Sequence, residues 1–176
     1  GTTHGTTLVK DMNPGPGGSN NTDVFSGPMG QFANVKGMLY FIAAKGSQDY
    51  IYRGNGTAQD TFIVSKAAGR NGDDPKPAFT YRNGYVYFFN SDWKYNEQYT
   101  LYRMPYTGKV ITHIEDLQAG WQNECVGGEI EMLALNGAIY FSGQFQEQPW
   151  DEPVRKPGGY ELIRSDGTEQ GTVSIH

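Results

Sequence analysis

Three stretches of the sequence share one pattern, FANVKGMLYF (Phe32–Phe41), FTYRNGYVYF (Phe79–Phe88) and MLALNGAIYF (Met132–Phe141). In each stretch, Lys-Gly or Asn-Gly stands between runs rich in β-branched and aromatic residues. These dipeptides tolerate the positive φ angles of a two-residue type I′ turn, and the flanking residues favour strands. Each stretch therefore predicts a β-hairpin.

Two further strands are expected after each hairpin. The expected third strands each end in arginine: Tyr50–Arg53, Thr100–Arg103 and Glu161–Arg164. The expected fourth strands follow a polar turn: Thr61–Lys66, Lys109–Ile114 and Gly171–Ile175. Four short antiparallel strands that recur every 47 (84 − 37) and 53 (137 − 84) residues match the blades of a β-propeller, with a β-sandwich as the alternative.

The sequence thus predicts an all-β fold with three four-stranded antiparallel blades of β-propeller type and one extra N-terminal strand. We expect a single repeat domain over residues 1–176, because this length suits one domain with its own core. Its parts are a surplus fourth strand in residues 1–11 and units at residues 31–66, 78–116 and 130–176.

The turn before the fourth strand has its own signature. It reads SDGTEQGT in the third unit (Ser165–Thr172) and GNGTAQDT in the first (Gly54–Thr61). Asp or Asn followed by Gly favours a tight turn, and the threonine hydroxyls can hydrogen-bond its backbone. The second unit has a shorter turn, Met104–Gly108.

The segment ELIRSDGT (Glu161–Thr168) with the following Gly171-Thr172 resembles the ELWxxDGT repeat family of bacterial surface and secreted proteins. The segment Gly5–Gly15 looks like that family's continuation after the motif. Where the family usually has tryptophan, this sequence has Tyr52, Tyr102 and Ile163. The resemblance implies propeller-like blades and an extracellular or cell-surface location, and it implies no reaction.

The two ends of the sequence carry the same element. Gly1, Thr2, Gly5 and Thr6 align with Gly167, Thr168, Gly171 and Thr172 at an offset of 166 (167 − 1). Thr7, Leu8, Val9 and Lys10 are therefore a fourth strand without its own blade, and an unpaired strand is a template for another chain. Three blades are also fewer than the four to eight of known propellers. We expect this assembly strand to pair with a copy of the chain or with the rest of a longer chain.

Composition excludes several classes of partner. The net charge of −5 with scattered Lys and Arg argues against nucleic acid. The longest apolar run, Met38–Ala44, is far shorter than the roughly 20 residues of a spanning helix, so no membrane insertion is expected. The single Cys125 allows only an intermolecular disulfide. Sequons at Asn20 and Asn55 predict glycosylation in an extracellular protein.

Aromatic and acidic residues in two long loops suggest a ligand site. Trp150, Asp151 and Arg155 occupy one loop, and Asp92 and Trp93 the other. An indole face beside carboxylates can stack on a sugar ring and bind its hydroxyls, which favours a carbohydrate-binding site. The alternative is that these aromatic side chains hold the loops onto the sheets.

Metal and catalytic motifs are weak. No cofactor is predicted, although the oxygen-rich stretches Ser19–Asp23 and Asn71–Asp74 leave calcium open. No His or Cys pair has zinc spacing, and no nucleophile elbow or P-loop is present. Glu129 and Glu131 share one face of an expected strand, which is typical of a solvated face.

The sequence therefore predicts a non-catalytic extracellular repeat module that acts in self-assembly, as a fibre or oligomer, or in cell-surface adhesion. A carbohydrate-binding lectin is one alternative, and a glycan-active hydrolase that uses carboxylates in the long loops is another.

Overall fold

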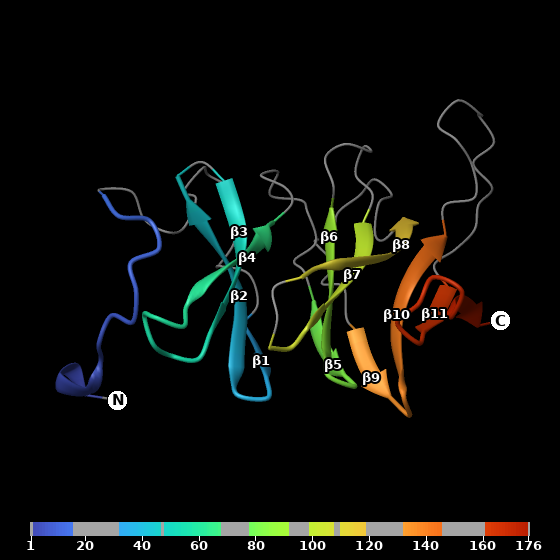
Figure 1. Cartoon of the computed structure of the whole chain (residues 1–176), viewed down its shortest axis with the longest axis horizontal. Helices are drawn as coiled ribbons and strands as arrows, with labels where there is room; N and C mark the ends of the chain where they lie inside the picture. The colour runs from blue at the N-terminus through green and yellow to red at the C-terminus, as the bar shows by residue number, and fades with distance from the viewer. Residues whose placement is uncertain are drawn as a thin grey trace. The chain divides into compact units, whose positions relative to one another are not determined.

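The computed structural model describes residues 2–15, 32–46, 48–67, 78–91, 99–107, 110–118, 132–145 and 161–175. These residues form β-strands and one short 3-10 helix, η1 (Thr3–Gly5) (Figure 1). Within these ranges, no helix has the length and apolar character needed to cross a membrane.

The strands form three four-stranded antiparallel sheets, each a meander in chain order. The first sheet contains β1 (Ala33–Val35), β2 (Met38–Lys45), β3 (Gln48–Gly54) and β4 (Phe62–Lys66). The second contains β5 (Phe79–Arg82), β6 (Tyr85–Ser91), β7 (Tyr99–Pro105) and β8 (Thr112–Gln118). The third contains β9 (Met132–Leu135), β10 (Ala138–Phe145), β11 (Glu161–Ser165) and β12 (Thr172–Ile175). The predicted repeat of three four-stranded antiparallel sheets is confirmed.

The hairpin turns have the backbone that the sequence predicts. Lys36, Asn83 and Asn136 have φ angles of 50°, 47° and 46°, and the glycines that follow them have 80°, 86° and 75°. Positive φ at both central residues defines a type I′ turn, whose twist matches that of the flanking strands. The turn chemistry therefore sets the same register in all three hairpins.

The chain divides into two compact units, residues 1–74 and 75–176. The first unit holds the first sheet, and the second unit holds the other two. In the second unit, the end of β10 pairs with the end of β8 through Gln144↔Gln118 and Phe145↔Leu117. This short ladder joins the two sheets into one eight-stranded sheet, visible in Figure 1 where β10 reaches β8. No closed propeller ring is present among the described strands.

The fourth strand of the second sheet differs from the prediction. It covers Thr112–Gln118 instead of Lys109–Ile114, so the expected loop after it begins later. The register shifts from Leu101↔Glu115 to Tyr102↔His113, which leaves Ile114 as the extra residue of a β-bulge. The bulge directs Ile114 into the core, where it is buried. The first sheet has a shift at the same repeat position, between Ile51 and Tyr52.

The predicted N-terminal strand is also corrected. Thr7–Lys10 belongs to no strand. The reason is that the third strands β3, β7 and β11 already pair with their own fourth strands, so none of them offers this segment a free edge.

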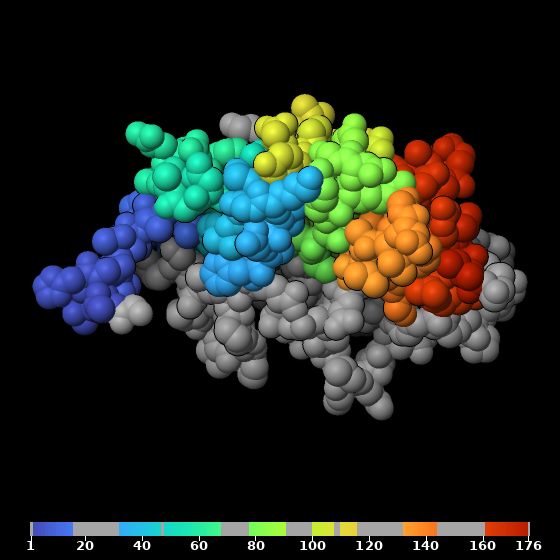
Figure 2. Space-filling model, turned by 90° about the horizontal axis from the view of Figure 1, so that it is seen from below, coloured from blue at the N-terminus to red at the C-terminus, as the bar shows by residue number. Residues whose placement is uncertain are grey.

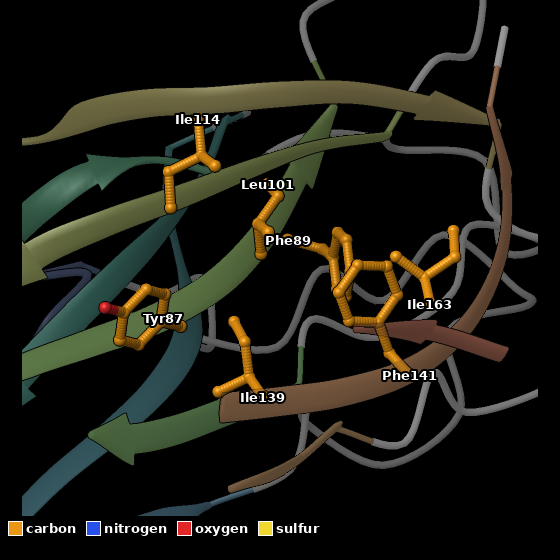
Figure 3. Packing of buried hydrophobic residues seen from close by; sticks show 7 residues of the cluster. All are labelled: Tyr87, Phe89, Leu101, Ile114, Ile139, Phe141 and Ile163. Atoms are coloured by element: carbon orange, nitrogen blue, oxygen red, sulfur yellow. The ribbon is translucent and has the colours of Figure 1, made fainter. Parts of the chain in front are cut away.

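Each sheet has two chemically distinct faces. We call the face with Tyr40, Tyr87 or Tyr140 the tyrosine face and the face with Phe41, Phe88 or Phe141 the phenylalanine face. In the second unit, the tyrosine face of the second sheet packs against the phenylalanine face of the third (Figure 3). The contributing residues are Tyr87, Phe89, Leu101 and Ile114 from the second sheet, and Ile139, Phe141 and Ile163 from the third. The Phe89 and Phe141 rings meet edge-to-face, with centroids 5.0 Å apart.

The first unit has its own small core on the phenylalanine face of its sheet. Phe41 stacks on Tyr52 with ring centroids 5.5 Å apart, and Ala43 is buried beside them. Met12 from the N-terminal segment packs against this cluster.

Candidate assembly interface

The turn before β12 is held by its own short side chains. Asp166 Oδ1 accepts hydrogen bonds from the Thr168 backbone N–H at 2.9 Å and from the Thr168 hydroxyl at 2.7 Å. The same hydroxyl oxygen accepts from the Gly171 N–H at 3.0 Å, and the Thr172 hydroxyl donates to the Thr168 carbonyl at 2.7 Å. These four bonds close the turn and start the fourth strand.

The turn before β4 has the same set of bonds. Asn55 Oδ1 accepts from the Thr57 N–H at 3.0 Å and the Thr57 hydroxyl at 2.9 Å. The Asp60 N–H donates to the Thr57 hydroxyl oxygen at 3.2 Å, and the Thr61 hydroxyl to the Thr57 carbonyl at 2.6 Å. The predicted likeness of the two turns is therefore present atom by atom.

Two sequence differences between the turns compensate each other. A Cβ at Gly171 would overlap the Asp166 carboxylate. In the first turn an aspartate, Asp60, stands at that position, and Asn55 Nδ2 donates to its Oδ2 at 2.7 Å. The neutral amide replaces a carboxylate that the Asp60 charge would repel.

Asp166 is the carboxylate whose hydrogen bonds close the third turn. The hydrogen bonds from the Thr168 hydroxyl and N–H lower the pKa of Asp166. Desolvation opposes this shift, and the positive charges of Arg82 and Arg164 lower the pKa further. A carboxylate with a lowered folded-state pKa stabilises the fold above its ordinary pKa of about 4. That stabilisation is lost as the pH falls through the folded-state value.

We therefore expect the urea midpoint of the second unit to fall with acidification below about pH 4 more steeply in the wild-type protein than in Asp166→Asn. The substituted amide keeps an acceptor oxygen, as Asn55 shows in the first turn, but it does not titrate. Urea titrations followed by tyrosine and tryptophan fluorescence at several pH values measure the difference. Equal slopes for both proteins would contradict the assignment.

The N-terminal segment begins with the second half of the same turn. The Gly5 N–H donates to the Thr2 hydroxyl oxygen at 3.0 Å, and the Thr6 hydroxyl donates to the Thr2 carbonyl at 2.9 Å. These are the bonds that Thr168, Gly171 and Thr172 make before β12. The sequence likeness of these two segments, 166 residues apart, thus extends to their hydrogen bonds.

The continuation of this segment lies against the first sheet. The Lys10 ammonium donates to the carbonyls of Ala58 and Thr61 in the turn before β4. Asn13 Oδ1 accepts from the N–H of Gly46, which directly follows β2, at 2.9 Å. By the repeat alignment, Asn13 corresponds to Gln118, which pairs near the end of β10 in the second unit. Residues 10–13 therefore touch the first sheet much as the end of β8 touches the third.

Between these anchors the segment is exposed. Leu8 is 82% exposed, and Val9 is exposed as well. The residue that corresponds to Val9 in the second sheet is Ile114, which is buried in the core. Val9 thus presents an apolar side chain at a position that is covered in the second sheet.

A second apolar surface lies on the tyrosine face of the third sheet. Cross-strand pairing places one set of exposed side chains on this face, between 40% and 61% exposed, which we call the third-sheet apolar face: Leu133, Leu135, Leu162, Val173 and Ile175. The hairpins that carry it, β9–β10 in orange and β11–β12 in red, lie side by side at the surface in Figure 2.

Comparison of equivalent positions shows what this face lacks. Ile51, Leu101 and Leu162 occupy the same place in the three third strands. Ile51 and Leu101 are 0% exposed, whereas Leu162 is 51% exposed. The third sheet therefore has the side chains of a buried face without a covering neighbour in the described residues.

Most of the residues proposed from the sequence lie outside the described ranges: Trp150, Asp151, Arg155, Trp93, Asp92, Asn20, Cys125, Glu129, Glu131 and the stretches Ser19–Asp23 and Asn71–Asp74. Asn55 is described, and its side chain is engaged within the turn. The four residues of the proposed assembly strand are described and exposed, apart from the half-buried Lys10.

Sequence reasoning missed the third-sheet apolar face. A signal was present in β9, where Leu133 and Leu135 take the positions of Thr80 and Arg82 in β5. Polar side chains in one repeat and apolar side chains at the same positions of the next indicate that the two strands face different neighbouring surfaces. Only the observed exposure shows which of the two faces is left open.

No family model matches this chain, and no curated protein or solved structure matches it at a significant level.

Proposed function

We propose that this chain is a non-catalytic, extracellular repeat module whose role is self-assembly into an oligomer or fibre. The observation that carries the proposal is the N-terminal segment Thr2–Lys10, which has the turn of a fourth strand and pairs with none of the third strands that the structure describes. The extracellular location follows the resemblance to the ELWxxDGT repeats and the two sequons. The propeller-type arrangement belongs to the same proposal, with several chains supplying the blades.

In the proposed assembly, Thr7–Lys10 of one chain displaces β12 from β11 of a neighbour and pairs with β11 in its place. The register follows from the 166-residue offset: Thr7 takes the position of Val173 opposite Arg164, and Val9 takes that of Ile175 opposite Leu162. Backbone hydrogen bonds supply the affinity of such strand addition. Met12 and Asn13 stay on the first sheet of the donor, so the exchanged strand links the two chains.

Cysteine pairs test this register directly in a Cys125→Ser background. Chains with Thr7→Cys mixed with chains with Arg164→Cys should form a covalent dimer under mild oxidation, because paired positions bring the Cα atoms within disulfide range. The control replaces Thr7→Cys by Val9→Cys, which lies roughly 7 Å farther along the strand. Non-reducing electrophoresis should show several-fold less dimer for the control.

Two outcomes would overturn the proposal. Equal dimer yields from both cysteine pairs would show collision without a defined register. A wild-type chain that stays monomeric by light scattering at its highest soluble concentration would show that no self-assembly occurs.

A further inference from the structure

We infer that β12 is a replaceable strand, and that Leu8 of a second copy, in the place of Ser174, favours its replacement. This inference rests on the proposed strand exchange and names the pair of residues that drives it. It starts from the position on the core side of β12 where the two competing strands differ, with serine in β12 and leucine in the N-terminal segment.

Ser174 lies beside an apolar core. It pairs with Ile163, and directly opposite residues of antiparallel strands share one face of the sheet. Ile163 is 0% exposed and belongs, with Phe141, to the core between the second and third sheets (Figure 3). The hydroxyl of the half-buried Ser174 donates to Glu161 Oε2. β12 therefore places a polar side chain at the edge of this core.

The fourth strands of the other two sheets have larger side chains at this position. In the first sheet, Ile63 pairs with Tyr52 and packs against the core cluster of that sheet. In the second, the His113 ring meets the Tyr102 ring edge-to-face, with centroids 5.9 Å apart. The repeat geometry therefore accommodates a large side chain at the position of Ser174.

Leu8 is such a side chain. By the 166-residue offset, it takes the position of Ser174 when Thr7–Lys10 pairs with β11. In the single chain Leu8 is 82% exposed, so its burial beside Ile163 removes apolar surface from water. The half-buried Glu161 can turn its carboxylate to water when the Ser174 hydroxyl leaves. The exchange thus replaces a polar contact by an apolar one at the edge of the core.

The other side chains of β12 are either matched by the donated strand or only half buried. Thr172 is buried, and its hydroxyl lies 2.7 Å from the Ser165 hydroxyl in a hydrogen bond. Thr6 has the position of Thr172 and can restore this bond. Val173 and Ile175 are already 43% and 40% exposed, so their displacement removes little burial. The donated strand therefore keeps the buried hydrogen bond of β12 and adds the burial of a leucine.

The connection of β12 to its own chain favours it at low concentration. A segment tethered near its binding site has a high effective concentration, which a separate chain matches only when the protein is concentrated. We therefore expect a dilute chain to keep β12 in place and strand donation to increase with concentration. The donor segment and the acceptor strand are different parts of each chain, so the association is heterologous and extends head to tail.

Exchanging the two residues tests the inference. Ser174→Leu gives β12 the side chain of its competitor, and Leu8→Ser removes that side chain from the donated strand. Each substitution should raise the dissociation constant of self-association about tenfold or more, because the advantage of the donated strand is lost. Light scattering over a series of concentrations measures this constant.

Two control variants separate this effect from the loss of the serine hydroxyl and from the loss of any exposed apolar side chain. Ser174→Ala removes the hydroxyl without adding a large apolar side chain, so it should not weaken association. Val110→Ser truncates a side chain that is 74% exposed and lies outside the exchanged strands, so it should leave the dissociation constant unchanged.

Mixing the two test variants gives the decisive result. Ser174→Leu retains an intact donor segment, and Leu8→Ser retains a replaceable β12. An equimolar mixture should therefore form dimers with one chain of each, although neither variant associates alone at the same concentration. Association at the wild-type level in either variant would overturn the inference, and so would a mixture that stays monomeric.

The cysteine pair separates this inference from the proposed function. Ser174→Leu, added to the chain with Arg164→Cys, should lower the yield of cross-linked dimer with the Thr7→Cys chain several-fold. Full yield in this background would leave strand donation standing and show that Leu8 and Ser174 do not decide the exchange. If the parent cysteine pair does not cross-link and the wild-type chain does not associate, self-assembly itself is wrong, and this inference is wrong with it.

Discussion

Leu101→Ala should destabilise the second unit by about 3–5 kcal/mol, whereas Leu162→Ala at the same repeat position should change its stability by less than about 0.5 kcal/mol. Leu101 is 0% exposed within the core between the second and third sheets. Its truncation therefore lowers the free energy of unfolding in two ways, through the lost transfer free energy of the side chain and through the cavity that it leaves. Leu162 is half exposed in the single chain, so its truncation leaves no cavity.

Urea unfolding at low protein concentration measures this difference, because dilution keeps the chain monomeric. Equal losses of stability in Leu101→Ala and Leu162→Ala at low concentration would contradict the observed difference in burial.

Gly167→Ala should destabilise the second unit by about 2–5 kcal/mol, and Gly56→Ala should destabilise the first by only about 1–2 kcal/mol. Both glycines have φ near +92°, which costs any residue with a Cβ. Only Gly167 has a neighbour in the way, because a Cβ there overlaps the Tyr87 hydroxyl. The difference between the two substitutions therefore isolates the contact between the tyrosine face and the turn.

Removing the hydroxyl should relieve part of the cost. In the double variant Gly167→Ala with Tyr87→Phe, the stability should exceed that of Gly167→Ala alone, because the atom nearest to the new methyl group is gone. Thermal or urea unfolding of the four proteins of this cycle gives the coupling. Additive effects would contradict the proposed overlap.

Local chemistry explains why the hairpins and turns could be predicted. Positive φ at Asn83 and Asn136 follows from residues adjacent in sequence, and the bonds around Thr168 span at most four residues. The N-terminal turn was also detectable, because Thr2, Gly5 and Thr6 repeat Thr168, Gly171 and Thr172 in both residue type and hydrogen bonds.

Long-range pairing explains what the sequence did not reveal. The fourth strand of the second sheet was misplaced because its register depends on the bulge at Ile114 and on pairing with β10, which comes from the next repeat. The open face of the third sheet was missed because Leu162 has the same apolar character as Leu101. Side-chain type reports a preference for burial, and only neighbouring sheets decide whether that burial occurs.

By itself, the sequence determined the repeat, the type I′ hairpins and the threonine-closed turns, since each depends on hydrogen bonds and backbone angles within a few residues. The tertiary structure alone decided which tyrosine face is covered and which is open. It also decided that the second and third sheets join through β8 and β10. The physical reason is that burial and strand edges are properties of contacts between distant segments, and equivalent residues in each repeat acquire them from different neighbours.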